Sequence, residues 1–161
     1  MLHDYDIALR LLAATAIGMV IGSNRDARGR PAGMRTLGLV SLGAAMIAIS
    51  AVNLPALQND PDALSRTVQG VIQGVMAGIG FLGAGVLIQR RQSMEVHGMT
   101  TAAAIWATAA LGIVAGLASW HVFLIGSAIT LLLLIVVHPA EQAVERWAEK
   151  RHNRRKSPKD D

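Results

Sequence analysis

The sequence contains no cysteine, which excludes disulfides, thiol catalysis and cysteine-ligated metal sites. Charged residues are also scarce: they make up 16% of the 161 residues, whereas 52% are hydrophobic. The long apolar stretches carry no aspartate or glutamate. A chain of this length forms one domain, and its composition is typical of a membrane protein rather than a cytosolic one.

The apolar residues fall in five blocks, which cover about residues 7–22, 36–54, 68–88, 99–118 and 122–138. Most blocks are close to the roughly 20 residues that a helix needs to cross a hydrocarbon core about 30 Å thick, and the first and last are short. The sequence therefore predicts an all-α membrane protein whose residues 1–138 form five transmembrane helices. Residues 139–161 are predicted to be a basic juxtamembrane tail.

Lysine and arginine are distributed unevenly around these blocks. Thirteen of the 15 lie in three segments, 23–35, 89–98 and 139–161. The positive-inside rule therefore predicts an external amino terminus and a cytoplasmic carboxyl terminus, which an odd number of spans requires. We interpret the first block as a retained span, because Asp4 and Asp6 stand where a signal peptide would be basic. The expected partner of the basic residues is anionic lipid headgroups at the cytoplasmic face, not nucleic acid.

The third block, extended to residue 89, runs for 22 residues without a charge yet contains six glycines. In a water-exposed helix each glycine costs about 1 kcal/mol relative to alanine. In a bilayer, glycines four residues apart let another helix approach closely, and Gly70, Gly74 and Gly78 form two overlapping GxxxG steps. Gly78, Gly80 and Gly83 also match GxGxxG. We reject a dinucleotide site there, because the strand, the helix and the acidic residue that this fingerprint requires are missing.

Small residues at the same spacing in the first and fourth blocks make those helices the expected packing partners of the third. The glycines expected at helix contacts are Gly18, Gly22, Gly70, Gly74, Gly78, Gly80, Gly83, Gly85, Gly112 and Gly116. Self-association into a homo-oligomer is also expected from these stripes. The sequence leaves open whether the five helices satisfy all the glycines within one chain.

Three polar residues lie in or beside the predicted spans. Arg10 lies one turn inside the first block, and a charge within a span is a functional candidate. A structural role is favoured, because Asp6 lies four residues earlier on the same helix face and can pair with Arg10. Gln69 and Gln73 share a helix face, so their amides are candidates for interhelical hydrogen bonds or for lining a polar path.

The segment 23–36 is the densest polar region before the tail. Its Gly29, Pro31 and Gly33 predict a turn of defined geometry that holds four arginines around Asp26. One interpretation is topological, with the arginines anchoring the loop in the cytoplasm. The other is functional: the loop docks an acidic or phosphate-bearing partner, because arginine binds such anions in a bidentate manner.

The sequence offers little chemistry for catalysis or metal binding. The five histidines do not share metal-ligand spacing, and no Ser/His/Asp set or buried carboxylate pair is discernible. Asp60 and Asp62, in a predicted external loop, are interpreted as solvated charges. We therefore expect a protein that is not an enzyme and has no cofactor.

Three long motifs occur in a specific order: a glycine, a charged pair and RPAGMRT within 22–36, GIGFLGAGVLIQR at 78–90, and GMTTAAAIWATAALG at 98–112. With these motifs the chain resembles the transmembrane domain of the MgtC/SapB family, whose runs read RPAGLRT, GIGFLGAGVI and GLTTAAxIWxxAAxG. The resemblance implies a multi-pass protein of the bacterial inner membrane, with some members linked to adaptation to low Mg²⁺. The candidate functional or partner-binding residues are Arg10, Asn24, Arg25, Asp26, Arg35, Thr36, Arg90, Thr100 and Thr101.

Two departures from the family pattern stand out. Asn24 occupies a position where many members have glutamate. From the sequence we expect a short basic tail in place of the soluble carboxyl-terminal domain of the longer members.

Two functions are consistent with these features. The leading prediction is a non-enzymatic inner-membrane protein that modulates a partner membrane complex and is linked to adaptation to low Mg²⁺ or stress. The alternative is a transporter or channel for a small solute or a divalent cation, with Gln69 and Gln73 along its path. Four arginines at the inner mouth would repel Mg²⁺, which ranks the transporter second.

Overall fold

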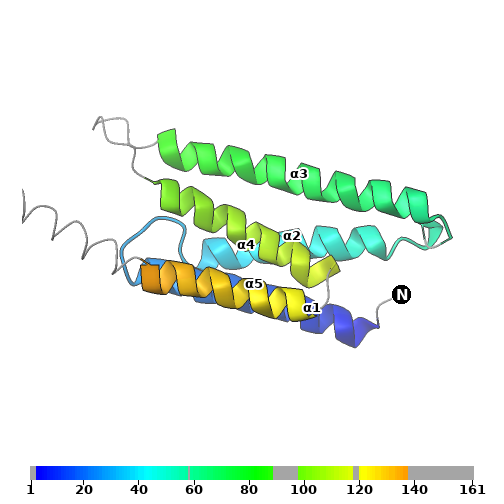
Figure 1. Ribbon diagram of the computed structural model, residues 1–161, viewed down its shortest axis with the longest axis horizontal. Helices are drawn as coiled ribbons and strands as arrows, with labels where there is room; N and C mark the ends of the chain where they lie inside the picture. The colour runs from blue at the N-terminus through cyan, green and yellow to red at the C-terminus, as the bar shows by residue number, and fades with distance from the viewer. Residues whose placement is uncertain (1–2, 58, 89–97, 118–119, 138–161) are drawn as a thin grey trace, which may run out of the picture. The chain divides into compact units, whose positions relative to one another are not determined.

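The computed structural model describes residues 3–57, 59–88, 98–117 and 120–137, and every regular element within these ranges is helical (Figure 1). The long helices are α1 (Asp4–Asp26), α2 (Met34–Val52), α3 (Pro61–Ile88), α4 (Met99–Leu117) and α5 (Trp120–Leu132). A 3₁₀ turn at Pro55–Leu57 precedes α3, and a π-helical segment at Leu133–Val137 follows α5. The candidate Arg90 and the predicted tail 139–161 lie outside the described residues.

Four of these helices are long and apolar enough to cross a membrane: α1, α2, α3 up to Leu87, and α4. The all-α membrane architecture predicted from the sequence is confirmed at this level. The fifth apolar block forms a shorter helix over Trp120–Ile135. At 1.5 Å per residue it rises about 24 Å, less than the hydrocarbon core of about 30 Å. The fifth crossing and the direction of the termini stay predictions.

The chain divides into two units, residues 1–127 and 128–161. The first unit contains α1 to α4 and the beginning of α5. All of the packing described below lies within this first unit.

The first helix is longer than the apolar block that predicted it. Asp4 and Asp6 lie in its first turn, where carboxylates interact favourably with the helix dipole. At its other end α1 continues to Asp26, so Asn24 and Arg25 belong to the last turn of a helix and not to a loop. The loop predicted over 23–36 is therefore confined to the seven residues 27–33.

The start of α3 follows from a proline and a carboxylate. Pro61 is the first helical residue, where its fixed φ suits the helix and its missing N–H is not needed. Asp60 Oδ1 accepts a hydrogen bond from the backbone N–H of Ala63 at 2.9 Å. Asp60 is exposed, which agrees with its interpretation as a solvated charge. It also caps the amino-terminal end of α3.

The core lies where α1 and α4 pack against α2. Gly18 on α1 lies so close to α2 that an added Cβ would collide with the carbonyl of Leu37. An added Cβ on Gly112 of α4 would likewise collide with the carbonyl of Ser41 on α2. At Gly116 an added Cβ would lie 2.8 Å from the Cβ of Ala48. These glycines let helix backbones approach one another, as small residues do between membrane helices.

The α3 helix is attached differently from the other three. It packs against α4 and against one side of α2, but only 6% of its most apolar 18-residue stretch is buried within the chain. The predicted packing of the glycine stripe of α3 on the first span is wrong, because α1 packs on α2 and α4 instead.

Contacts of individual α3 glycines show which side of this helix is open. Gly83 lies in ordinary van der Waals contact, with an added Cβ 3.4 Å from the Cβ of Ala102 on α4. At five other glycines an added Cβ would meet no atom of the described residues within 4 Å: Gly70, Gly74, Gly78, Gly80 and Gly85. None of these five glycines therefore has a neighbour on its Cβ side in the part of the chain that the structure describes, and the sequence had left open whether the helices of one chain satisfy them.

Candidate functional site

Arg25, in the last turn of α1, connects three parts of the chain. It is only 2% exposed, and its Nη2 donates hydrogen bonds to Thr101 Oγ1 on α4 at 2.6 Å and to Pro31 O at 2.8 Å. Its Nε lies 3.2 Å from Pro31 O and 3.1 Å from Ala32 O. A buried charge is tolerated only when it is well hydrogen-bonded, and two carbonyls and a hydroxyl provide that here. Arg25 thereby holds the loop 27–33 against the start of α4.

Asp26, the next residue, fixes the same loop at its other end. Its Oδ2 accepts a hydrogen bond of 2.8 Å from the backbone N–H of Met34, the first residue of α2. A side chain on Gly33 would collide with this carboxylate, so the close approach requires glycine. Gly29 and Ala32 have φ of 61° and 60°, and this left-handed conformation is strained for alanine. The two adjacent charged residues therefore hold the loop in one geometry.

The other candidates around this loop lie nearer the surface. Asn24 is half-buried, and three residues are exposed: Arg35, Thr36 and Thr100. The structure thus brings Arg25, Asp26 and Thr101 to one place and leaves Arg35 and Thr36 at the first turn of α2. The sequence had placed all four loop arginines around Asp26, whereas Arg25 is directed to backbone carbonyls and a threonine.

Arg10 forms a second polar cluster, remote from the loop in sequence. Its Nε donates to Asp6 Oδ2 at 3.0 Å, which confirms the pairing expected from the four-residue spacing. Two further contacts were not foreseen: Nη1 donates to the carbonyl of Ala115 on α4 at 2.8 Å, and the guanidinium carbon lies 5.4 Å from the centroid of the Trp120 ring. Arg10 therefore ties α1 to the end of α4 and to the start of α5.

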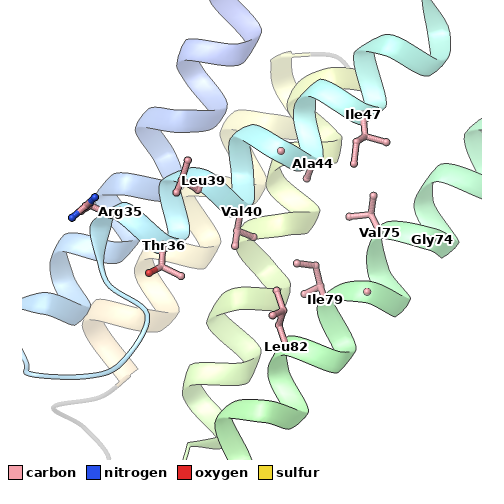
Figure 2. A pocket seen from close by; sticks show the side chains of 12 residues that line it. Arg35, Thr36, Leu39, Val40, Ala44, Ile47, Gly74, Val75, Ile79 and Leu82 are labelled. Atoms are coloured by element: carbon pink, nitrogen blue, oxygen red, sulfur yellow. The ribbon is translucent and has the colours of Figure 1, made fainter.

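An open groove of about 730 Å³ lies between α2 and α3 (Figure 2). Its two polar residues, Arg35 and Thr36, lie at one end. From α2 the apolar lining consists of Leu39, Val40, Gly43, Ala44 and Ile47. From α3 it consists of Gly74, Val75, Gly78, Ile79 and Leu82. Sequence reasoning missed this groove, although Gly43 in the second apolar block was a signal that it did not use.

Gln69 and Gln73 are exposed on α3. Among the residues that the structure describes, neither amide makes a hydrogen bond to another helix. No group of three or more histidine or acidic side chains suited to a metal ion occurs in that part of the chain.

The MgtC family model matches residues 11–143. The chain belongs to the MgtC family. It is similar to Protein SrpB of Synechococcus elongatus, with 47% identity over 136 residues, which are 80% of this chain and 72% of that protein. Protein MgtC of Salmonella typhimurium strain LT2 is 37% identical over 86% of this chain and 55% of its own length. The putative magnesium transporter YhiD of Escherichia coli K12 is 38% identical over 80% and 58%, respectively.

The chain thus spans less than two thirds of the length of the MgtC and YhiD proteins that it matches. No solved structure matches it significantly. Within this MgtC-family chain the first motif forms the loop 27–33 and its flanks, residues 78–88 of the second lie in α3, and the third leads into α4. The hydrogen bond from Arg25 to Thr101 therefore joins the first motif to the third.

Proposed function

We propose that this chain is a non-enzymatic, multi-pass protein of the bacterial inner membrane that binds and modulates a partner membrane complex during adaptation to low Mg²⁺ or stress. Membership of the MgtC family supports the membrane setting, and similarity to the putative magnesium transporter YhiD supports the link to magnesium. The orientation that we propose has the amino terminus outside and the carboxyl terminus in the cytoplasm, with a fifth crossing formed by the last apolar block.

The observation that carries this proposal is the open glycine face of α3. Gly70, Gly74 and Gly78 follow one another at four-residue spacing, and Gly85 lies seven residues further along the same face. An added Cβ at any of the four meets no described atom within 4 Å. Within a bilayer there is no hydrophobic drive between helices, so association depends on close packing at faces of this kind. A membrane helix of another protein, or of a second copy, is the occupant that this face fits.

The loop 27–33 supports the same role at one end of the helices. Arg25 and Asp26 fix its backbone, so the loop is ordered before any partner binds. A preorganised loop loses less conformational freedom on binding, which favours affinity. Arg28 is exposed on this loop, and anionic lipid headgroups or an acidic segment of the partner would complement its charge.

The experiment is site-specific photocrosslinking in cells, with the photoreactive residue at Ala77 of α3, followed by purification and mass spectrometry. We expect one integral-membrane partner, and its yield should fall at least several-fold in Gly70→Leu and Gly85→Leu. Gly80→Leu is the matched control, because Gly80 is equally open but lies off the row formed by Gly70, Gly74 and Gly78. Recovery of only nonspecific neighbours, or equal losses in all three variants, would refute partner binding at this face.

A second candidate function is magnesium transport, which the similarity to YhiD, named a putative magnesium transporter, favours. Purified protein in liposomes that contain a Mg²⁺-sensitive dye would decide between the two. Saturable Mg²⁺ entry that Gln73→Leu abolishes would establish transport. Dye signals equal to those of empty liposomes would leave the modulator as the function.

A further inference from the structure

The groove between α2 and α3 has a shape that a slender apolar chain fits. On α2 it extends from Arg35 to Ile47, a separation of 12 residues, or about 18 Å of helix. One leaflet of a hydrocarbon core about 30 Å thick is about 15 Å deep, so the groove matches a single leaflet rather than a whole bilayer. Ten of its twelve lining residues are apolar and the groove is open, so an apolar chain can lie in it.

Glycines give the groove its depth. Gly43 on α2 and Gly74 and Gly78 on α3 line it, and an added Cβ at each would meet no described atom within 4 Å. Figure 2 shows the side chains of Val40, Val75 and Ile79 between the two helices, with Thr36 toward the end of α2 where the helix begins. An apolar guest in this groove would therefore lie against helix backbone as well as against branched aliphatic side chains.

The polar end of the groove has the chemistry of a phosphate site. The first turn of α2 lies there, where a helix dipole and free backbone N–H groups favour an anion. The N–H groups of Arg35 and Thr36 have no acceptor within the described residues, as is usual in the first turn of a helix. The Arg35 side chain and the Thr36 hydroxyl add an exposed cation and a donor.

From this juxtaposition we propose that the groove is a binding site for one anionic phospholipid. An acyl chain lies between α2 and α3, and the phosphate group is held by Arg35, Thr36 and the first-turn amides of α2. The charge of Arg35 selects an anionic headgroup, and the length of the groove selects a chain of one leaflet. The site shares Gly74 and Gly78 with the glycine row of the proposed partner face, whereas Gly70 and Gly85 lie outside its lining.

The test is native mass spectrometry of the full chain released from mild detergent, with dioleoyl phosphatidylglycerol as the probe and dioleoyl phosphatidylcholine as the neutral comparison. We expect wild type to retain one phosphatidylglycerol with at least tenfold preference over phosphatidylcholine. Arg35→Ala should abolish the preference, and Gly43→Leu should weaken binding of both lipids at least tenfold by filling the groove. Gly78→Leu, on the opposite wall, repeats this test should Gly43→Leu fail to fold.

Two matched controls should bind as wild type does. Arg66→Ala removes an exposed arginine from α3 outside the groove, and Gly80→Leu adds the same bulk to α3 outside it. Melting temperatures of all variants in lipid-free detergent separate lost binding from lost folding.

Three results would overturn the lipid site. One is that wild type, like Arg35→Ala, retains phosphatidylglycerol and phosphatidylcholine in equal amounts. Another is binding of inorganic phosphate as tight as that of the lipid, since it would show an anion site without an acyl groove. The third is a change in the mass of the oligomer in Gly43→Leu with unchanged lipid retention, since a second copy would then occupy the groove. Because Gly70→Leu leaves the groove unaltered, failure of the lipid site and failure of the partner face are distinguishable.

Discussion

Arg25 and Thr101 are 76 positions apart in the chain, yet Arg25 Nη2 donates a hydrogen bond of 2.6 Å to Thr101 Oγ1. Both residues are buried, and the bond joins the last turn of α1 to the first turn of α4. Both helices also pack on α2, so this single contact fixes the end of a three-helix core next to the loop 27–33. Three consequences for stability and one for topology are open to measurement.

Thr101→Val should destabilise the chain, because the buried guanidinium of Arg25 loses one of its acceptors without any change in volume. The expected loss in free energy of unfolding is about 1–3 kcal/mol, the cost of an unsatisfied buried polar group. Unfolding in mixed micelles with increasing sodium dodecyl sulfate would measure it. Thr100→Val is the matched control: Thr100 is exposed, so its variant should stay within about 0.5 kcal/mol of wild type. Equal effects at both threonines would contradict a specific role of the Arg25 contact.

Glycine-to-alanine substitutions should separate packed glycines from open ones. Gly18→Ala places a Cβ against the Leu37 carbonyl, and the overpacking should cost about 1–3 kcal/mol or more. Gly70→Ala has free space around it and should stabilise α3 by up to about 1 kcal/mol, the difference in helix propensity. Thermal unfolding of the purified variants in one detergent is the measurement. A stabilising Gly18→Ala would show that α1 and α2 are further apart than described.

The contacts of Arg10 should differ in strength. Asp6 and Arg10 are four residues apart on one helix, and such pairs are worth about 0.3–0.5 kcal/mol, so Asp6→Asn should have a small effect. The guanidinium over Trp120 should contribute about 0.5–2 kcal/mol, because it is partly shielded from water. A double-mutant cycle of Arg10→Met and Trp120→Leu would measure this coupling through the free energy of unfolding. Zero coupling in that cycle would show that the two side chains do not interact.

The topology is directly testable because the chain has no cysteine of its own. Single cysteines at Arg28, Asn59 and Asp161 can be probed in intact cells with a membrane-impermeant maleimide. In the proposed orientation only Asn59→Cys reacts from outside, and the other two react after the cells are permeabilised. Reaction of Asp161→Cys in intact cells, with Arg28→Cys protected, would mean that the last apolar block does not cross the membrane.

The sequence predicted the helices, the ion pair and the turn, which depend on residues close to one another in the chain. The apolar blocks matched four long helices, and the spacing of Asp6 and Arg10 predicted an ion pair within one helix. Both follow from helix geometry, which brings residues four apart together. The turn over Gly29 and Gly33 was predicted for the same reason, since it depends on residues next to it in the chain.

Contacts between distant segments could not be predicted from one sequence. A GxxxG row shows that a helix can be approached closely, but it does not specify the partner, and the row on α3 has none within the described residues. Arg25 was expected to face Asp26 as part of an arginine cluster, because the sequence does not show which carbonyls the loop would turn toward it. The groove depends on the separation of α2 and α3, which is determined by the packing of both helices on α4 and by their direct contact with each other.

The length of α3 has a consequence at the membrane surface. Its apolar part, residues 68–88, rises about 31 Å and spans the hydrocarbon core with little tilt. The seven residues before it, which begin at the Asp60 cap and Pro61, add about 10 Å of helix. In a bilayer this first stretch of α3, with Asp62 and Arg66, would stand in the headgroup layer and the water beyond it. The partner complex proposed above would then meet α3 outside the hydrocarbon core as well as at its glycine face.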